Sequence, residues 1–413
     1  MSLQSLTDEH TDFNQGTMSP SFDTPPHWIS VLSHLDPRYG GLSTVVPQLS
    51  SLLADTGSFS MGVSAFCNPG EHYMPSKGSC LKISYWPTSR LIWLKDLAIR
   101  SRFRDEIGSA KGVHIHGLWE QSTATAARTA RSLRIPYVLS AHGMLEPWAL
   151  SNRKWKKIFY AALVERANVE GAACVHALTH AEAQDYRRFG CTRPVAVIPN
   201  GVAVPDNPSP DIFISKFPSL KNKKIILFLG RIHYKKGLDI LIESWAELSK
   251  QSPEAHLVIA GPDFEGTKTK LEARICELGV AQDVTFTGML SGDLKWSTMA
   301  AADCFVLPSY SEGLSVSILE AMAMSLPVVI SDRCNLPEVR QAEAGWVIEP
   351  KQSELTAALA DFTRNSIGTN RKIGREGARL VARRYNWSIV TQQFTELYQW
   401  VQGGSRPQAV DLV

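Results

Sequence analysis

Residues 308–324 read PSYSEGLSVSILEAMAM, and they follow a short apolar run, CFVL, at residues 304–307. The apolar run is typical of a buried parallel strand. Proline, serine and glycine residues then indicate a loop. From Ser315 onward, the spacing of Ile, Leu, Met and Ala predicts a helix, with this serine as its N-cap. A strand, a glycine-containing loop and a helix N-terminus form an arrangement that suits phosphate, because free N–H groups and the helix dipole face the ligand.

Two carboxylates lie in this stretch, Glu312 in the predicted loop and Glu320 inside the predicted helix. Leucine, alanine and methionine flank Glu320, so its carboxylate requires a partner, because burying an unpaired charge is costly. A pair of sugar hydroxyls would serve as that partner. An exposed helix edge or an ion pair with an arginine are the alternatives, and spacing alone leaves them open.

The Glu-x7-Glu spacing of Glu312 and Glu320 within PSYSEGLSVSILEAMAM resembles the donor-site signature of the family-4 retaining glycosyltransferases. The resemblance covers nearly the whole chain from about residue 27. It implies the GT-B fold, an α/β architecture of two Rossmann-like, doubly wound parallel-sheet domains that face each other across a cleft. It also implies that a C-terminal helix crosses back to the first domain.

Alternating strand-like and helical patterns follow the first strand, WISVLSHL at residues 28–35. The strand-like runs are MGVSAFC, LKISYW, GVHIHG, IPYVLSAHG, ACVHAL and VAVIPNG. This alternation predicts a parallel doubly wound sheet, whose ligands bind at the carboxyl ends of the strands. A Pro-rich segment, VPDNPSPDIFISKFPSLKN, indicates a linker to a second domain that begins with the strand KKIILFLG.

These patterns and the resemblance together divide the chain into five parts. They are a disordered tail (1–26), an acceptor-binding domain (27–203, with the crossing helix 386–402), a linker (204–222), a nucleotide-sugar-binding domain (223–385) and a loose tail (403–413).

Arg231 and Lys236 lie in the predicted strand-to-helix loop that opens the second domain. Two fixed cations there could neutralise a diphosphate, although alone they would be ordinary loop charges. Together with Glu312 and Glu320 they match the diphosphate-binding pair of the family. By the same resemblance, the other donor-binding residues are Gly40, Gly41, Met289, Leu290, Gly313, Leu314 and Ser315.

His116 and His142 close two predicted strands of the first domain. A hydrogen-bonded structural role is the alternative for each of them. The resemblance places His142 beside the transferred sugar, as a catalytic residue with Glu312, Arg231 and Lys236. We expect His116 and Glu146 on the acceptor side. The segment AHGMLEPWAL around them resembles family members that build bacterial surface polysaccharides.

The composition excludes several classes of protein. A balance of 43 Lys and Arg against 40 Asp and Glu, a net charge of +3, is too small to indicate a nucleic-acid partner. Seven cysteines without a CxxC pair indicate reduced thiols rather than a disulfide framework. The polar N-terminus and the lack of a membrane-spanning apolar run predict a cytoplasmic protein. No Asp-x-Asp motif or His/Asp ligand cluster is present, so we expect no metal or other cofactor.

Two basic stretches of the first domain, residues 90–104 and 152–159, are candidates for peripheral contact with the inner face of a membrane. A solvated helix face that packs its apolar side on the sheet is the alternative.

The resemblance implies transfer of a hexose, with glucose from UDP-glucose as our choice, to a hydroxyl of a saccharide or lipid-linked acceptor in polysaccharide biosynthesis. Retention of configuration is part of that implication. A non-catalytic nucleotide-sugar-binding scaffold subunit and a GT-B UDP-sugar epimerase are the alternatives.

Overall fold

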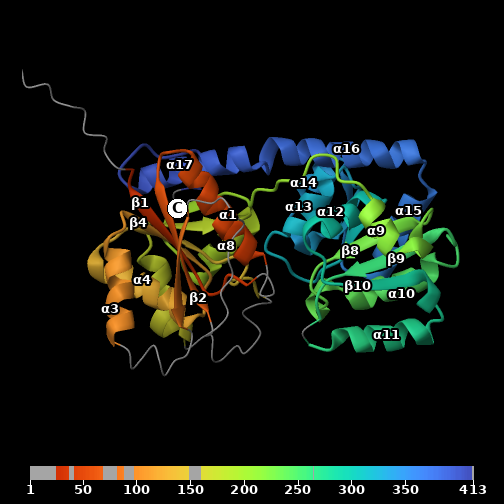
Figure 1. Ribbon diagram of the computed structural model, residues 1–413, viewed down its shortest axis with the longest axis horizontal. Helices are drawn as coiled ribbons and strands as arrows, with labels where there is room; N and C mark the ends of the chain where they lie inside the picture. The colour runs from red at the N-terminus through yellow and green to blue at the C-terminus, as the bar shows by residue number, and fades with distance from the viewer. Residues whose placement is uncertain are drawn as a thin grey trace, which may run out of the picture.

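The computed structural model of the protein describes residues 25–36, 41–67, 81–87, 97–147, 160–263 and 265–411. Two sheets with helices on their faces form two domains that lie side by side (Figure 1). Each sheet follows the strand order of a doubly wound fold. The predicted fold class, two Rossmann-like domains in the GT-B arrangement, is therefore confirmed.

The first domain is built on an eight-stranded sheet of order β14-β7-β6-β5-β4-β1-β2-β3, in which only β14 is antiparallel. Its strands are β1 (His27–Leu32), β2 (Ser60–Cys67), β3 (Lys82–Pro87), β4 (Gly112–His116), β5 (Tyr137–Ser140), β6 (Cys174–Ala177), β7 (Val195–Val197) and β14 (Val410–Asp411). Its helices are α1 (Leu42–Asp55), α3 (Leu97–Gly108), α4 (Gln121–Leu133), a π-helix (Ala161–Glu165), α7 (Arg166–Glu170) and α8 (His180–Phe189).

The second domain is built on a six-stranded parallel sheet of order β10-β9-β8-β11-β12-β13. Its strands are β8 (Lys224–Leu229), β9 (Ala255–Ala260), β10 (Val284–Gly288), β11 (Cys304–Leu307), β12 (Val328–Ser331) and β13 (Gly345–Ile348). Its helices are α9 (Asp211–Lys216), α10 (Leu238–Leu248), α11 (Thr267–Glu277), α12 (Gly292–Ala301), α13 (Val316–Ala323), α14 (Glu338–Gln341), α15 (Gln352–Arg364) and α16 (Ile367–Arg384).

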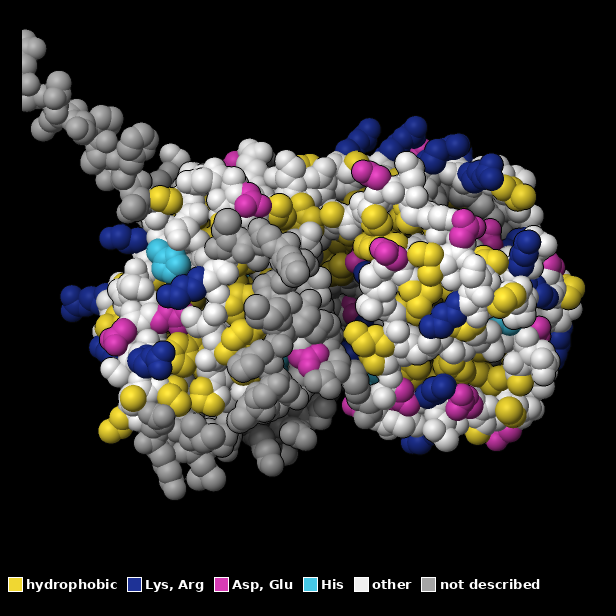
Figure 2. Space-filling model, in the orientation of Figure 1, with side chains coloured by type: hydrophobic (Ala, Val, Ile, Leu, Met, Phe, Trp, Pro, Cys, Tyr) yellow, Lys and Arg dark blue, Asp and Glu magenta, His cyan; other side chains and the backbone are white. Residues whose placement is uncertain are grey.

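Helix α17 (Trp387–Val401) continues from α16 and returns the chain to the first domain, so that the two helices run along one edge of both domains (Figure 1). Tyr398 of α17 stacks on Trp28 of β1 with ring centroids 3.8 Å apart. Beside the junction of the two helices, the Val202 N–H donates to the Tyr385 carbonyl at 2.8 Å. The crossing helix is thus part of the first-domain core. Lys and Arg side chains gather along α16 on the outer surface (Figure 2).

Two segments differ from the sequence interpretation. The predicted linker 204–222 contains α9, whose Phe213 is fully buried in the second-domain core. The predicted loose tail 403–413 contains β14, where Val410 pairs with Ala196 of β7. Both elements are too short to produce a periodic pattern, and contacts with distant residues stabilise them.

The basic stretches lie largely outside the described residues, at 90–96 and 152–159. The described remainder, 97–104, belongs to α3, which buries Phe103 and Ile107 and exposes its basic side chains. None of the helices in the described ranges is long and apolar enough to span a membrane.

Candidate functional site

The loop between β11 and α13 holds Glu312 from several sides. Asn335 donates its side-chain N–H to the Glu312 carbonyl at 2.6 Å. The buried Glu312 carboxylate accepts from the Ser309 hydroxyl at 2.6 Å and from the Lys236 ammonium at 2.5 Å. Burial raises the pKa of Glu312, but the Lys236 charge and hydrogen bond, with that of Ser309, outweigh it and hold the pKa below its usual value. Glu312 is therefore an ionised group beside the N-terminus of α13.

Lys236 reaches this loop because of the turn that precedes α10. The turn, Tyr234–Lys236, ends at Gly237, which has φ +67°. A Cβ at Gly237 would lie 2.1 Å from the Pro308 carbonyl oxygen, so only glycine allows this approach. Arg231 lies in the same connection, two residues after β8, and its side chain is exposed. Both predicted cations are thus found at the carboxyl end of β8, next to the Glu312 loop.

Glu320 is buried on α13 and forms an ion pair with Lys295 of α12 at 2.5 Å. Burial raises the pKa of Glu320, and the Lys295 charge opposes that effect. One alternative for Glu320 was an ion pair with an arginine. The structure shows an ion pair with a lysine instead. The burial of this carboxylate therefore does not by itself require a ligand. The sequence did not indicate Lys295, because nothing in its spacing shows which helices adjoin.

His142 and His116 lie together at the carboxyl ends of β5 and β4. His142 Nε2 is 3.0 Å from His116 Nδ1. Burial lowers the pKa of His142 to about 3 and that of His116 well below its usual value, so both rings are neutral. His142 Nδ1 and His116 Nε2 are buried and have no hydrogen-bond partner among the described residues. These two nitrogens can bind a ligand's polar groups.

Glu146 connects the two domains. Its Oε2 accepts from the Ser311 hydroxyl, and the Lys235 ammonium lies 4.0 Å from the same oxygen. Its Oε1 is buried without a hydrogen-bond partner in the described structure. Burial raises the pKa of Glu146 to about 7, although Ser311 and Lys235 act in the opposite direction. We expected Glu146 on the acceptor side. The structure places its carboxylate against Ser311, which is the residue before Glu312 in the other domain.

The main chains of the two domains also meet here. A Cβ on Gly143 would lie 3.2 Å from Gly313 Cα, so the loop after β5 touches the loop after β11. The structure thus brings His142, His116 and Glu146 of one domain to Glu312, Gly313 and Lys236 of the other.

The remaining predicted donor residues are spread more widely. Gly40 lies outside the described residues, and Gly41, the N-cap of α1, has no atom within 4 Å of a Cβ built on it. Met289 and Leu290 follow β10, which β9 and β8 separate from β11. Leu314 and Ser315 lie at the N-terminus of α13. Ser315 is the N-cap by position, but its hydroxyl lies 3.0 Å from the Ser317 hydroxyl instead of capping a main-chain N–H.

A chain of hydrogen bonds, in which each donor can be assigned, lies next to His116 and His142. His176 Nε2 lies 2.7 Å from the Ile198 carbonyl, which can only accept, so Nε2 carries the proton. The neutral His176 then accepts from Ser140 at Nδ1, Ser140 accepts from His114 Nε2, and His114 Nδ1 accepts from Tyr398, each at 2.6 Å. This chain joins β4, β5 and β6 to α17. Histidine counts alone could not reveal it, because it depends on strand register.

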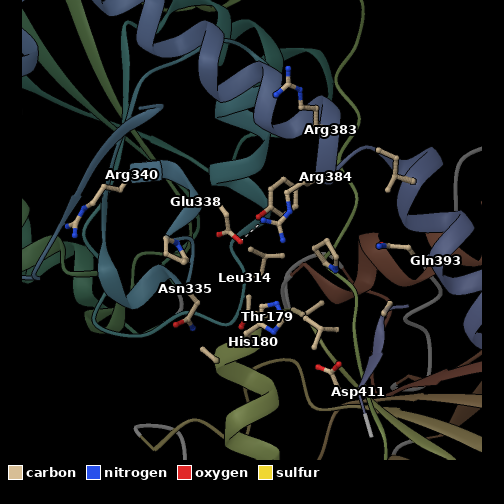
Figure 3. Close-up of a pocket in the computed structure, with 18 of the residues that line it drawn as sticks. Thr179, His180, Leu314, Asn335, Glu338, Arg340, Arg383, Arg384, Gln393 and Asp411 are labelled. Atoms are coloured by element: carbon tan, nitrogen blue, oxygen red, sulfur yellow. Dashed lines mark hydrogen bonds and ion pairs between the residues drawn. The ribbon is translucent and has the colours of Figure 1, made fainter. Parts of the chain in front are cut away.

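A cavity of about 710 Å³ lies between the domains beside the α16–α17 junction (Figure 3). Thr179 and His180 of α8 line one side, and Glu338 and Arg384 line another and form an ion pair at 2.9 Å. The cavity includes Leu314 but none of the charged donor candidates. Within the described ranges, no group of three or more His, Cys, Asp and Glu side chains is arranged to hold a metal ion.

Two family descriptions match the chain. "Glycosyl transferases group 1" matches residues 211–380, and "Glycosyl transferase 4-like domain" matches residues 40–201. Alpha-D-kanosaminyltransferase of Streptomyces kanamyceticus is 27% identical over 331 residues, which make up 77% of this chain and 83% of that protein.

Two solved structures show the same fold. Sucrose-phosphate synthase from Thermosynechococcus elongatus superposes with a TM-score of 0.74 at 20% identity, covering 92% of this chain and 100% of that one. HepE of Anabaena, in complex with UDP-glucose, superposes with a TM-score of 0.73 at 17% identity, covering 91% and 100%.

Proposed function

Because the chain belongs to the family-4 glycosyltransferases with the GT-B fold, we propose that it transfers glucose from UDP-glucose, with retention of configuration, to a hydroxyl of a saccharide or lipid-linked saccharide. A relative that acts as a kanosaminyltransferase and a fold neighbour that binds UDP-glucose support this choice of reaction and donor. The AHGMLEPWAL segment supports a role in surface polysaccharide synthesis. The proposal includes peripheral membrane contact through residues 90–104 and 152–159.

The observation that carries the proposal is the ion pair of Lys236 and Glu312 at the N-terminus of α13. In the free protein each group neutralises the other. A diphosphate would take over Lys236, with Arg231 and the α13 N–H groups as further partners. Glu312 would then be released to accept from sugar hydroxyls, with the Gly313 and Leu314 N–H groups beside it. Breaking the Lys236–Glu312 pair would thus make Lys236 available to the diphosphate and Glu312 available to the sugar.

Charge stabilisation is the main chemical demand of the reaction. The leaving nucleoside diphosphate gains negative charge, and Arg231, Lys236 and the α13 N-terminus would stabilise it. These groups supply the positive charge that a metal ion provides elsewhere, so we propose a metal-independent reaction. In the proposed front-side displacement, the C1–O bond to the diphosphate breaks as the acceptor oxygen bonds to C1, and the acceptor proton moves to the leaving phosphate.

Polar groups of both domains would contact the sugar, the acceptor and the ribose. His142 stays uncharged at working pH and can hydrogen-bond the transferred sugar through Nδ1. Glu146 Oε1 and His116 Nε2 are unpaired and would bind the acceptor. Glu320 would bind the ribose hydroxyls with the oxygen that Lys295 leaves free.

Calorimetric titration of UDP, GDP and ADP without added metal tests the donor site. We expect micromolar binding of UDP, and we expect Lys236→Ala and Glu320→Ala each to weaken it by about tenfold or more, since each removes a charged contact. Lys268→Ala is the matched control, because Lys268 pairs with Glu272 and lies over the Phe286 ring, and neither partner is a predicted donor residue. Transfer of glucose from UDP-glucose to a saccharide acceptor then tests the reaction.

Binding of GDP or ADP in place of UDP would overturn the donor assignment but leave the mechanism intact. A covalent glycosyl-enzyme trapped on Glu312 would contradict front-side displacement. Product formed from the donor without an acceptor would favour the epimerase alternative, and unchanged cellular product in His142→Ala and Glu312→Ala would favour the scaffold.

A further inference from the structure

The first turn of α8 carries a buried carboxylate whose hydrogen bonds leave the helix. Glu182 is three residues after the N-cap Thr179, whose hydroxyl accepts from the Glu182 N–H at 3.2 Å. In a capping box, a glutamate at this position returns to the N–H of the N-cap residue. Here Oε2 accepts from the Leu178 N–H at 2.7 Å, and Oε1 accepts from the Gly143 N–H at 2.6 Å. The side chain therefore binds the loop after β5 as well as the residue that precedes the N-cap of its own helix.

A second residue of the same helix face binds the same loop. Tyr186, one turn after Glu182, accepts from the Ala141 N–H at 2.7 Å and donates to the Leu139 carbonyl at 3.0 Å. Helix α8 thus holds the main-chain N–H groups on both sides of His142. These hydrogen bonds hold His142 in a left-handed conformation, with φ +53°, which is uncommon for a residue with a Cβ, while Gly143 adopts φ +76° without that cost. A left-handed histidine persists only where its surroundings determine it.

We infer that Glu182 is a positioning residue, which holds the left-handed His142–Gly143 turn and thereby directs the His142 ring toward the sugar of the donor. The inference rests on the proposed function only for the role of His142. The same bond sets the place of Gly143, which touches Gly313 of the other domain. Glu182 therefore positions a ring and a domain contact without touching substrate.

The charges around Glu182 make these N–H bonds its main favourable interactions. The charged groups that face it are Glu146, from the loop, and Asp185, on its own helix, and both repel it. Arg188 pairs with Asp185. Burial, opposed by the bonds from Gly143 and Leu178, raises the pKa of Glu182 to about 7. A buried carboxylate without a cation is favoured only through the main-chain groups that it binds.

A double-mutant cycle tests whether Glu182 acts through His142. We expect Glu182→Ala to lower kcat by about 10- to 100-fold, because a small displacement of a positioned group has an effect of that size. In a His142→Ala background the same change should lower kcat by less than about threefold, since its effect has already been lost. Glu182→Gln keeps one acceptor oxygen and should lie between wild type and Glu182→Ala. UDP binding should be unchanged throughout.

Hydrogen exchange of peptides that cover residues 139–146 provides a second readout, which requires no activity. Glu182→Ala should raise exchange there and leave β8 to β13 protected. Glu170→Ala is the matched control, because Glu170 also binds a main-chain N–H, that of Thr192 at 2.8 Å, far along the chain from the site. Equal losses of kcat in both backgrounds, or unchanged exchange at 139–146, would overturn the inference. An inactive wild type would contradict the proposed function, and the exchange result would still decide the role of Glu182.

Discussion

The two buried carboxylates of the proposed donor site each have a lysine partner in the free protein. Glu312 pairs with Lys236 and Glu320 with Lys295, both at 2.5 Å. All four side chains are largely buried, so each pair combines strong attraction with a large desolvation cost. Removing one member leaves the other charged and buried, which is more damaging than removing both. The binding site and the stability of the domain are therefore coupled at the level of single residues.

We expect Lys236→Ala to lower the free energy of unfolding by about 3–5 kcal/mol, because it leaves the buried Glu312 charge without its hydrogen-bonded cation and with only the charge of Lys235 nearby. The double variant Lys236→Met with Glu312→Gln should recover most of that loss, while donor binding stays lost. Urea unfolding of the single and double variants measures both values. A double variant that is less stable than Lys236→Ala would contradict the argument.

At the scale of elements, the sequence predicted individual strands, loops and helices better than it predicted the contacts between them. The strand-loop-helix unit at residues 304–323 was recognisable because apolar runs, a glycine and an N-cap are local signals. Arg231 and Lys236 could be placed because their loop follows a predicted strand. Lys295 and Glu182 could not be found, because their partners lie 25 and 39 residues away and depend on how helices pack. The same limit concealed the hydrogen-bond chain beneath the histidines.

The turn before α10 gives a prediction at this scale. Gly237→Ala should weaken UDP binding by more than about tenfold, because the new Cβ would push the turn, and Lys236 with it, away from Pro308. Gly279→Ala is the matched control, since Gly279 has φ +72° and open space around it. Both variants place an alanine at positive φ, but only Gly237→Ala also creates a clash. Calorimetry on both variants therefore separates the effect of the clash from that of the backbone strain. Similar affinities in the two variants would show that the approach to Pro308 does not matter.

At the scale of the molecule, the crossing helix and the first sheet share a buried polar network. His176 lies within it, and burial lowers the pKa of His176 to about 4. In the unfolded chain a histidine binds a proton below about pH 6.5, whereas the buried ring stays neutral until the pH approaches its own pKa. Between these two pH values the unfolded state binds more protons, so acidification destabilises the fold.

His176→Asn removes this titration. Its free energy of unfolding should therefore depend less on pH, by about 1.4 kcal/mol per pH unit between the two pKa values. Above pH 7 the variant should be less stable than wild type, by about 1–3 kcal/mol for the lost bond to Ile198. Denaturation series at several pH values measure both effects. Parallel pH profiles for the two proteins would show that His176 does not titrate as described.

The stacking of Tyr398 on Trp28 has a consequence for synthesis of the chain. The first strand leaves the ribosome well before its aromatic partner, because the whole second domain lies between Trp28 and Tyr398 in the chain. The second-domain sheet is continuous between α9 and α16, so it can fold before α17 is translated. The first domain is then completed after the second, which is the reverse of the usual N-terminal-first order. Until α17 is translated, the face of β1 that carries Trp28 is an open surface that chaperones would have to cover.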